Sequence, residues 1–266
     1  VQAIQDCIDA GVKSAVIFTA GFAEMDDDGA AQQREMEAII RASDMRAVGP
    51  NCLGVFNVKD GWYGTFANAP GMIEVPPGPV GIVTQSGAYG SHVFGAAQAR
   101  RVGANYWVTT GNECDVDVAE VIEYYAQADD VKVILAYAEG MKSADRICQA
   151  LEMARDAGKP VIFQKVGKSD IGALAAASHT ASLAGSDAVY DALFKQYGVY
   201  RAESTEEMVN IAYACQFGRY PAGRKISLQT ISGGVGVQMA DAADKYKLDV
   251  EPMPEGTQKK LKELLP

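Results

Sequence analysis

Short runs of β-branched and other apolar residues alternate along this chain with segments of helical periodicity. Between the runs, apolar residues recur every three or four positions, so each segment would turn one apolar stripe toward a sheet. This alternation is typical of βαβ units, which close a parallel sheet with helices on both faces. We therefore predict an α/β fold with doubly wound parallel sheets. The predicted strands cover residues 13–18, 46–48, 80–84, 104–108, 132–137, 160–164 and 225–231.

Two stretches rich in proline and glycine, residues 70–79 and 219–224, interrupt this pattern and divide the chain into three pieces. Residues 1–75 carry a strand, a helix and a short strand, which is half of a doubly wound domain. Residues 76–220 carry four or five βα units and could fold alone. Residues 221–266 carry one strand, a glycine-opened helix and a short terminal helix, and we interpret them as the start of another domain.

The charge of the chain narrows the range of partners. Its 266 residues have a net charge of -10 and a pI near 4.8, a field that repels phosphate backbones and anionic headgroups. We therefore expect no nucleic-acid and no membrane partner. No run is long enough to span a bilayer and no signal peptide is evident, which favours the cytoplasm. The five cysteines show no paired spacing, so we expect reduced thiols and no metal site.

The residues that follow each strand are the first candidates for a site, because ligands of open parallel sheets bind beyond the carboxyl ends of the strands. A glycine there lets the backbone approach an anion, and a helix start adds free N–H groups and a favourable dipole. Ser86 with Gly87, and Ser232 with Gly233 and Gly234, have this setting. One such turn is more often a plain connection than a phosphate site, and two in one chain shift the balance toward phosphate.

Two familiar nucleotide motifs are incomplete in this chain. Residues 167–169 have the letters that end a P-loop, but Ile162 stands where the motif needs a glycine. Residues 234–236 begin a dinucleotide fingerprint, but the bulky Met239 occupies the place of its third small residue. An NAD-dependent oxidoreductase is therefore disfavoured.

The two histidines of the chain differ in context. His92 falls in the helix after Ser86 without an acidic neighbour at helical spacing, so we interpret it as structural. His179 falls in a run of small and hydroxyl residues that can form a mobile loop. A neutral imidazole is a competent nucleophile when a carboxylate fixes its tautomer, and Glu139, directly after a predicted strand, is the candidate carboxylate. On loop context alone, an exposed histidine without a partner is the more common alternative.

Residues 178–187, Ser-His-Thr-Ala-Ser-Leu-Ala-Gly-Ser-Asp, resemble the phosphohistidine segment of the NDP-forming acyl-CoA synthetases, relatives of the succinyl-CoA synthetase α subunit. A small departure is Ala181, where glycine is common in the family. Other matching segments follow in the family's order, and together they cover the whole chain. These segments are residues 21–24, 49–54, 85–88, 111–113, 115–118 and 137–140.

The resemblance implies a role for each matching residue. His179 would carry the phosphoryl group, Glu139 would hold its imidazole, and Ser86 with Gly87 would cradle the phosphate at a helix start. The helix start at residues 232–234 would receive the phosphohistidine at its other station. The residues expected near CoA and the acyl group are Gly21, Phe22, Asn51, Cys52, Gly111 and Asn112.

The family's chemistry implies an acid-thiol ligase that forms acyl-CoA from a carboxylic acid, CoA and ATP or GTP, with release of NDP and phosphate. Residues 1–75 would be the C-terminal part of a Rossmann-like CoA-binding domain, residues 76–220 a flavodoxin-like ligase domain, and residues 221–266 the start of a second one. We expect the nucleotide and Mg²⁺ to bind in an ATP-grasp domain or β subunit outside this chain. The chain alone would then be inactive, and we expect the enzyme to be an oligomer.

Two alternatives come from other classes of protein. One is a non-catalytic acyl-CoA-binding regulatory module of the kind fused to some protein acetyltransferases, although such modules tend to lack the phosphorylated histidine. The other is a CoA-transferase or hydrolase of similar fold, in which Cys52 would be the nucleophile. Loss of Cys52 should then abolish activity.

Overall fold

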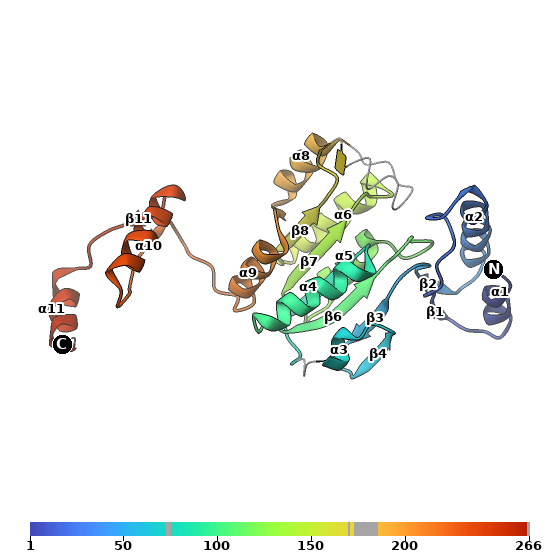
Figure 1. Cartoon of the computed structure of the whole chain (residues 1–266), viewed down its shortest axis with the longest axis horizontal. Coiled ribbons are helices and arrows are strands. Elements are labelled where there is room, and N and C mark those ends of the chain that lie inside the picture. The colour runs from blue at the N-terminus through green and yellow to red at the C-terminus, as the bar shows by residue number, and fades with distance from the viewer. Residues whose placement is uncertain (73–75, 170, 173–185, 265–266) are drawn as a thin grey trace. The chain divides into compact units, whose positions relative to one another are not determined.

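The structure is a computed structural model that describes residues 1–72, 76–169, 171–172 and 186–264 (Figure 1). It separates into two compact units, Val1–Gly218 and Arg219–Pro266. The division lies at the start of the second proline- and glycine-rich stretch. No helix in the described ranges combines the length and the apolar character needed to cross a membrane.

The first unit begins with a small lobe, residues 1–48, built on two parallel strands. Its elements are α1 (Gln2–Asp9), β1 (Ser14–Val16), α2 (Asp27–Arg41) and β2 (Arg46–Val48). Asp26 starts α2 by capping it, since its carboxylate accepts a hydrogen bond from the amide of Gly29 at 2.8 Å. Met36 and Ile40 of α2 pack in a small core with Cys114, a residue from the distant loop after β6. This contact joins the lobe to the rest of the unit.

A seven-stranded sheet forms the main body of the first unit, in the order β4-β3-β6-β5-β7-β8-β9. Five of its strands are parallel, namely β5 (Val80–Thr84), β6 (Ala104–Thr109), β7 (Val133–Ala138), β8 (Val161–Lys165) and β9 (Tyr200–Arg201). The edge hairpin of β3 (Gly54–Asn57) and β4 (Trp62–Thr65) is antiparallel to β6 through β3. The α/β prediction of a mainly parallel sheet is confirmed.

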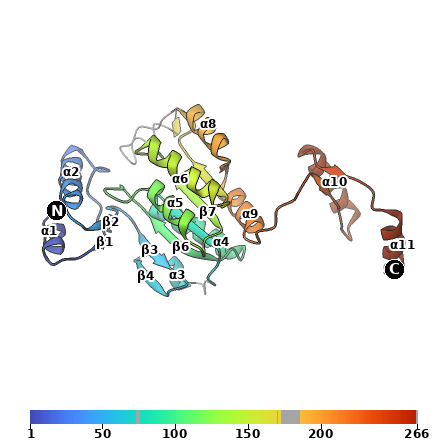
Figure 2. The same ribbon diagram turned by 180° about the vertical axis from the view of Figure 1, so that it is seen from behind.

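Helices cover both faces of this sheet, as the opposite views of Figure 1 and Figure 2 show. One face is covered by α4 (Gly87–Ala99) and α9 (Thr205–Cys215), the other by α5 (Val118–Gln127), α6 (Ala144–Asp156) and α8 (Asp187–Tyr197). Separate apolar cores fill the two sides, one around Phe94 and Trp107 and the other around Ile122 and Leu151. Because both faces are covered, all residues of β5 and β7 are buried, which explains their continuous apolar sequence.

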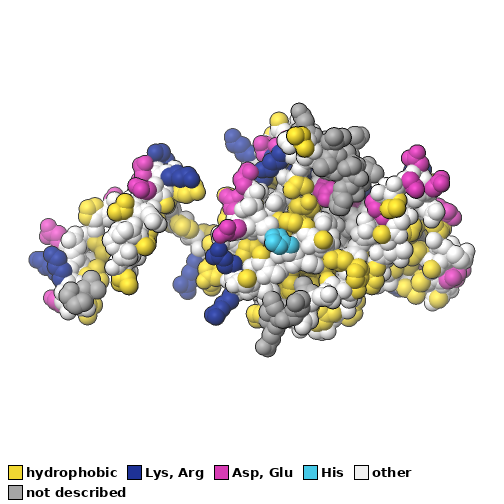
Figure 3. Space-filling view, in the orientation of Figure 1, with side chains coloured by type: hydrophobic (Ala, Val, Ile, Leu, Met, Phe, Trp, Pro, Cys, Tyr) yellow, Lys and Arg dark blue, Asp and Glu magenta, His cyan; other side chains and the backbone are white. Residues whose placement is uncertain are grey.

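The hairpin β3–β4 was not predicted from the sequence. Its strands lie before residue 75, yet they pair with β6, so the large sheet extends across the predicted boundary between the first two pieces. The dipeptide Asp60-Gly61 in its turn is a hairpin signal that could have revealed it. The short helix α3 (Ala69–Met72) follows β4, and Trp62 and Phe66 are exposed near this edge. Other apolar side chains are visible between charged ones on the face drawn in Figure 3.

The second unit contains α10 (Gly233–Lys245), α11 (Glu255–Leu264) and a parallel pair of two-residue strands, β10 (Lys225–Ile226) and β11 (Asp249–Val250). The predicted strand at residues 225–231 is therefore too long, and the prediction of one strand missed β11. The reason is physical, because a strand extends only as far as it has a partner and β11 pairs with two residues. Lys225 and Val250 are among the strand residues that stay exposed.

Candidate functional site

A cavity of about 350 Å³ opens in the first unit, at the carboxyl ends of the parallel strands of the lobe and of the large sheet. Seven of the residues predicted from the sequence line it, namely Asn51, Cys52, Ser86, Gly87, Gly111, Asn112 and Glu139. The other lining residues are Phe18, Ala20, Leu53, Phe66, Gln85 and Ala88. The cavity wall thus comes from the loops after β1, β2, β5, β6 and β7, together with the edge hairpin.

The remaining predicted site residues lie elsewhere. Gly21 and Phe22 do not line the cavity, but their amides donate to the carboxylate of Glu24 at 2.6 and 3.2 Å. Ser232 caps α10 in the second unit, where its hydroxyl accepts from the amide of Val235 at 3.5 Å. The predicted phosphate carrier, His179, lies outside the described residues.

The cavity floor depends on close backbone contact between two loops. Gly49-Pro50 is a cis peptide bond, and Asn51 follows with a φ of 58°. Gly111 has a φ of 59°, and a Cβ at this position would lie 2.2 Å from the carbonyl oxygen of Pro50. Only glycine satisfies both conditions, the left-handed backbone and the absent side chain. The amide of Asn112 then donates to the same Pro50 oxygen at 2.9 Å.

Asn112 ties the loop after β6 to the lobe. Its Nδ2 donates to Glu24 and, at 3.0 Å, to Oε1 of Gln33 in α2, while its Oδ1 accepts from Asn51 at 3.3 Å. Burial works to raise the pKa of Glu24, but hydrogen bonds from Gly21, Asn112 and nearby backbone outweigh it and lower the pKa. Glu24 is therefore an ionised anchor that holds the first loop of the lobe against the cavity.

The start of α4 faces the same cavity. Ser86 caps the helix, since its hydroxyl accepts from the amide of Tyr89 at 3.3 Å. Gly87 packs against Leu53, because a Cβ there would lie 2.5 Å from the Leu53 Cγ. The start of α4 thus lies at the cavity wall, and helix starts carry unpaired N–H groups and a positive dipole end. Such a start can hold an anion without adding a net basic charge.

Glu139 follows β7 directly and is buried, with 4% of its surface exposed. Its carboxylate accepts a hydrogen bond from the hydroxyl of Tyr137 at 3.4 Å, and its amide donates to Oε1 of Gln85 at 2.7 Å. Tyr137 also stacks on Tyr89 with ring centroids 4.1 Å apart. A buried carboxylate is thus fixed at the cavity wall, beside the start of α4.

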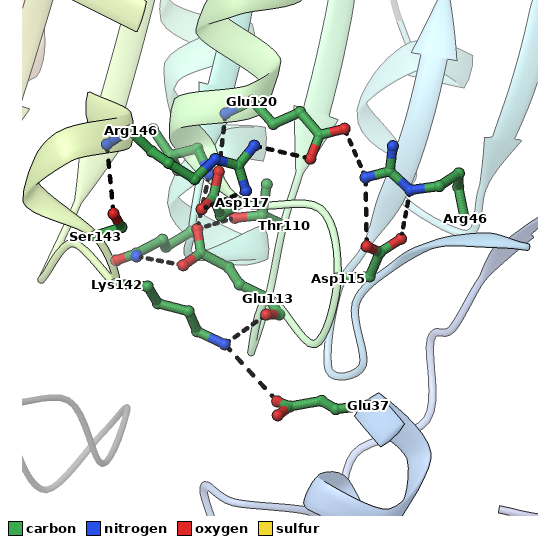
Figure 4. Close-up of polar contacts among 12 residues, drawn as sticks. Glu37, Arg46, Thr110, Glu113, Asp115, Asp117, Glu120, Lys142, Ser143 and Arg146 are labelled. Atoms are coloured by element: carbon green, nitrogen blue, oxygen red, sulfur yellow. Dashed lines mark hydrogen bonds and ion pairs between the residues drawn. The ribbon is translucent and has the colours of Figure 1, made fainter. Parts of the chain in front are cut away.

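A second buried carboxylate, Glu113, lies behind this wall and was not chosen from the sequence. Figure 4 shows it among Thr110, Asp117 and Lys142. The hydroxyl of Thr110 and the amide of Val118 both donate to its Oε1 at 3.0 Å. Burial raises the pKa of Glu113 to about 7, while the nearby Lys142 ammonium works to lower it. Its sequence signal was a polar residue two positions after Gly111, on the predicted site loop.

Glu113 predicts a pH dependence of stability. A carboxyl whose folded pKa lies above its ordinary value stabilises the fold at low pH, and this contribution is lost as pH rises from 4.5 through about 7. The gap corresponds to at most ~3 kcal/mol at about 1.4 kcal/mol per pH unit. We expect wild type to exceed Glu113→Gln in unfolding free energy by more at pH 5 than at pH 8, in urea titrations. An equal difference at both pH values would contradict this prediction.

Cys52 contributes a thiol to the cavity wall, but its environment keeps the thiol protonated. The side chain is 2% exposed, and its Sγ donates to the carbonyl oxygen of Ile17 at 3.4 Å. Burial raises the pKa of the Cys52 thiol to about 11. Since the thiolate is the nucleophile, Cys52 is poorly suited to attack at neutral pH. Among the residues that the structure describes, no group of three or more His, Cys, Asp or Glu could hold a metal ion.

The whole chain is similar to known acyl-CoA ligases, and its central part matches a family model. A family model described as succinyl-CoA ligase like flavodoxin domain matches residues 77–215. The protein named acetate-CoA ligase (ADP-forming) II subunit alpha of Pyrococcus furiosus is 37% identical over 100% of this chain, which spans 56% of that relative. The 4-hydroxybutyrate-CoA ligase (ADP-forming) of Nitrosopumilus maritimus is 32% identical over 99% of this chain, which spans 37% of that relative.

A solved structure resembles the chain equally well. Acetyl-coenzyme A synthetase 1 of Ca. Korarchaeum cryptofilum, described as dinucleotide forming and in complex with phosphate and ADP, superposes with a TM-score of 0.89 at 32% identity. The match covers 100% of this chain and 56% of that one. The chain therefore spans about half the length, or less, of the relatives it matches.

Proposed function

Because the chain belongs to the family built on the succinyl-CoA ligase-like flavodoxin domain, we propose that it is the CoA-side part of an acid-thiol ligase. The whole enzyme forms acyl-CoA from a carboxylic acid, CoA and a nucleoside triphosphate. The relatives are named as ADP-forming, which favours ATP over GTP as that nucleotide. Their names give different acids, acetate in one and 4-hydroxybutyrate in another.

One observation carries this proposal. Seven residues chosen from the sequence, on four loops far apart along the chain, line a single cavity at the carboxyl edge of the strands. The cavity combines a helix start for a phosphoryl group with a buried carboxylate, Glu139, and a wall of small and amide side chains. This combination suits the positioning and charge stabilisation that phosphoryl transfer requires.

The proposed roles are those that the family resemblance implies for the residues of the cavity wall. The first amides of α4, beyond Ser86 and Gly87, bind the phosphoryl group. Asn51 and Asn112, which line the cavity, would lie near the CoA thiol and the acyl group. Glu139 accepts a hydrogen bond from the imidazole of His179 and so keeps its other nitrogen free to attack phosphorus.

The reaction then proceeds in three balanced steps. His179 takes the γ-phosphoryl group of ATP and releases ADP. The phosphohistidine passes this group to the carboxylate of the acid, which forms an acyl phosphate and regenerates the imidazole. The thiol of CoA attacks the acyl carbon, the C–O bond to phosphate breaks, and acyl-CoA and inorganic phosphate result. The helix start can stabilise the phosphoryl charge in the last two steps.

Other parts of the enzyme would bind the nucleotide and supply the phosphoryl group. We propose that ATP and Mg²⁺ bind in an ATP-grasp domain or β subunit, and that the helix start at residues 232–234 serves the phosphohistidine at the nucleotide end of the reaction. The division of residues 1–75, 76–220 and 221–266 among a Rossmann-like domain and two flavodoxin-like domains is part of the same proposal. This chain spans 56% of one relative and 37% of another, so both relatives are long enough to hold such parts.

A ligase assay on the full-length enzyme tests this function. The enzyme is incubated with ATP, Mg²⁺, CoA and a panel of carboxylic acids, and thioester, ADP and phosphate are measured together. We expect the three products in equal amounts with at least one acid. Acyl-CoA binding without any of these products would instead favour the regulatory module, which the ligase names of the relatives do not favour.

The environment of Cys52 supplies a prediction that separates the ligase from a transferase or hydrolase with a cysteinyl intermediate. We expect Cys52→Ala to keep turnover within about tenfold of wild type, because a buried protonated thiol contributes packing rather than attack. The measurement is kcat for acyl-CoA formation at pH 7.5. Complete loss of activity in a variant that remains folded would support the cysteinyl route.

A further inference from the structure

We propose that Glu113 is a positioning residue, whose ionised carboxylate orients the side-chain amide of Gln85 and thereby holds the turn at Glu139 and Gly140 in place at the cavity. Glu113 itself does not line the cavity; it acts through Gln85, which does. The inference deepens the proposed function and rests on it for its catalytic consequence. Its structural part stands on contacts that are independent of any activity.

Both the oxygen and the nitrogen of the Gln85 side-chain amide bind the backbone just after β7, and we call this set of contacts the Gln85 clamp. Its Oε1 accepts from the backbone amides of Glu139 at 2.7 Å and Gly140 at 3.4 Å. Its Nε2 donates to the carbonyl oxygen of Gly140 at 2.7 Å and to Oε2 of Glu113 at 3.1 Å. These contacts are satisfied only when the oxygen points toward the Glu139 amide and the nitrogen toward Glu113.

The carboxylate of Glu113 has one oxygen available for this contact. Its Oε1 already accepts from Thr110 and Val118, so its Oε2 is the acceptor that remains for Gln85. A proton on Oε2 would face the N–H group of Gln85, and two donors would then oppose each other. Protonation therefore removes the acceptor that fixes the clamp, and a buried donor left without its partner is costly.

The charged groups around Glu113 come from several elements. Asp117 at the start of α5 raises the pKa of Glu113, and Lys142 after β7 lowers it. Lys142 in turn lies 3.8 Å from Glu37 of α2, and Arg146 of α6 lies 3.4 Å from Asp117. Charges of both signs therefore lie around Glu113, and burial is the largest of the influences on its pKa.

The clamp is consequently sensitive to pH near neutrality. With a pKa of about 7, Glu113 is ionised at pH 8 and largely protonated at pH 6. We expect the turn at residues 139–140 to loosen on acidification while the fold as a whole gains stability from the protonated group. Opposite responses of the turn and of global stability are a signature that a purely structural carboxyl would not give.

The test compares full-length wild type with Glu113→Gln by hydrogen exchange and kinetics. The glutamine keeps the size of the side chain, but its oxygen must serve Thr110 and Val118, so its NH₂ group faces Gln85. We expect the protection factors of the Glu139 and Gly140 amides, corrected for intrinsic exchange, to fall about tenfold from pH 8 to pH 6 in wild type. In Glu113→Gln they should be low at both pH values.

Two further variants make the result specific. Glu120→Gln is the control, because Glu120 belongs to the neighbouring ion pairs with Arg46 and Arg146 and has no bond to Gln85. It should leave the protection of residues 139–140 unchanged. Gln85→Met removes the amide itself, so adding Glu113→Gln to it should lower neither protection nor kcat much further. This cycle separates action through Gln85 from a general effect on folding.

The kinetic arm gives a separate answer. We expect kcat for acyl-CoA formation to fall about tenfold in Glu113→Gln with little change in KM for CoA, and the fall of wild-type kcat below pH 7 to disappear. Equal amide protection in wild type and Glu113→Gln would overturn the positioning role. Absence of acyl-CoA synthesis by wild type would overturn the proposed function and leave the exchange result to decide the clamp.

Discussion

Exchange of His179 for alanine in the full-length enzyme is expected to abolish phosphoenzyme formation and to lower acyl-CoA synthesis by about 10³-fold or more. The reason is chemical, because the imidazole is the only group in the proposed reaction that bonds to phosphorus between ATP and the acid. The chain contains one other histidine, His92, which is exposed on α4 with its ring centroid 6.1 Å from that of Tyr89. His92 therefore offers a matched control.

The measurement is acid-labile ³²P bound to the protein after incubation with labelled ATP and Mg²⁺. Wild type and His92→Ala should both carry bound label that treatment with dilute mineral acid releases. When the carboxylic acid substrate is added instead, this label should pass into acyl phosphate or inorganic phosphate. His179→Ala should carry none. Full labelling of His179→Ala would show that another residue carries the phosphoryl group.

Exchange of Gly111 for alanine is expected to have a large structural effect for the addition of a single methyl group. The new Cβ would lie 2.2 Å from the carbonyl oxygen of Pro50 and 2.6 Å from that of Asn51. Neither atom belongs to a flexible side chain, so the loop after β2 or the loop after β6 must shift. With the left-handed φ of 59° added, we expect a loss of ~3 kcal/mol or more in unfolding free energy.

Gly158 supplies the control for this substitution. It has a similar φ of 66°, and nothing lies within 4 Å of a Cβ at that position. Gly158→Ala should therefore cost only the backbone term, ~1 kcal/mol, and should leave acyl-CoA synthesis unchanged. Urea unfolding and the ligase assay measure both effects. Similar costs for the two variants would mean that the loops at Pro50 and Gly111 yield easily and do not shape the cavity.

The parallel strands of the large sheet were predictable because each of their positions is buried. In β5 and β7 every position is buried between the helices on the two faces, so the chain carries nearly continuous apolar runs, broken only by Thr84 at the end of β5. The hairpin β3–β4 gives a weaker signal, since its four-residue strands leave Trp62 and Tyr63 exposed. The strand at residues 225–231 was predicted too long because propensity does not reveal the length of a partner.

The candidate site was predictable for a different reason. The rule that ligands bind beyond the carboxyl ends of parallel strands selects loops without any knowledge of the tertiary contacts. It points to the loops that hold Asn51, Ser86, Gly111 and Glu139, which line one cavity, and the family resemblance singled out Asn51 and Gly111 within those loops. The rule did not reveal that Gln85 and Glu113, which lie in two of these loops, contact each other. They are 28 residues apart, and their contact depends on how β5, β6 and β7 lie side by side.

The sequence by itself determined the α/β class, the central strands and the loops that carry the polar groups, because periodicity and glycine placement are local properties of the chain. Only the tertiary structure decided which of these groups face one another. It buried Glu113 and raised its pKa, kept Cys52 protonated, and brought the Pro50 carbonyl against Gly111. Burial and close approach depend on atoms distant in sequence, and the free energy of a charge or a methyl group depends on those atoms.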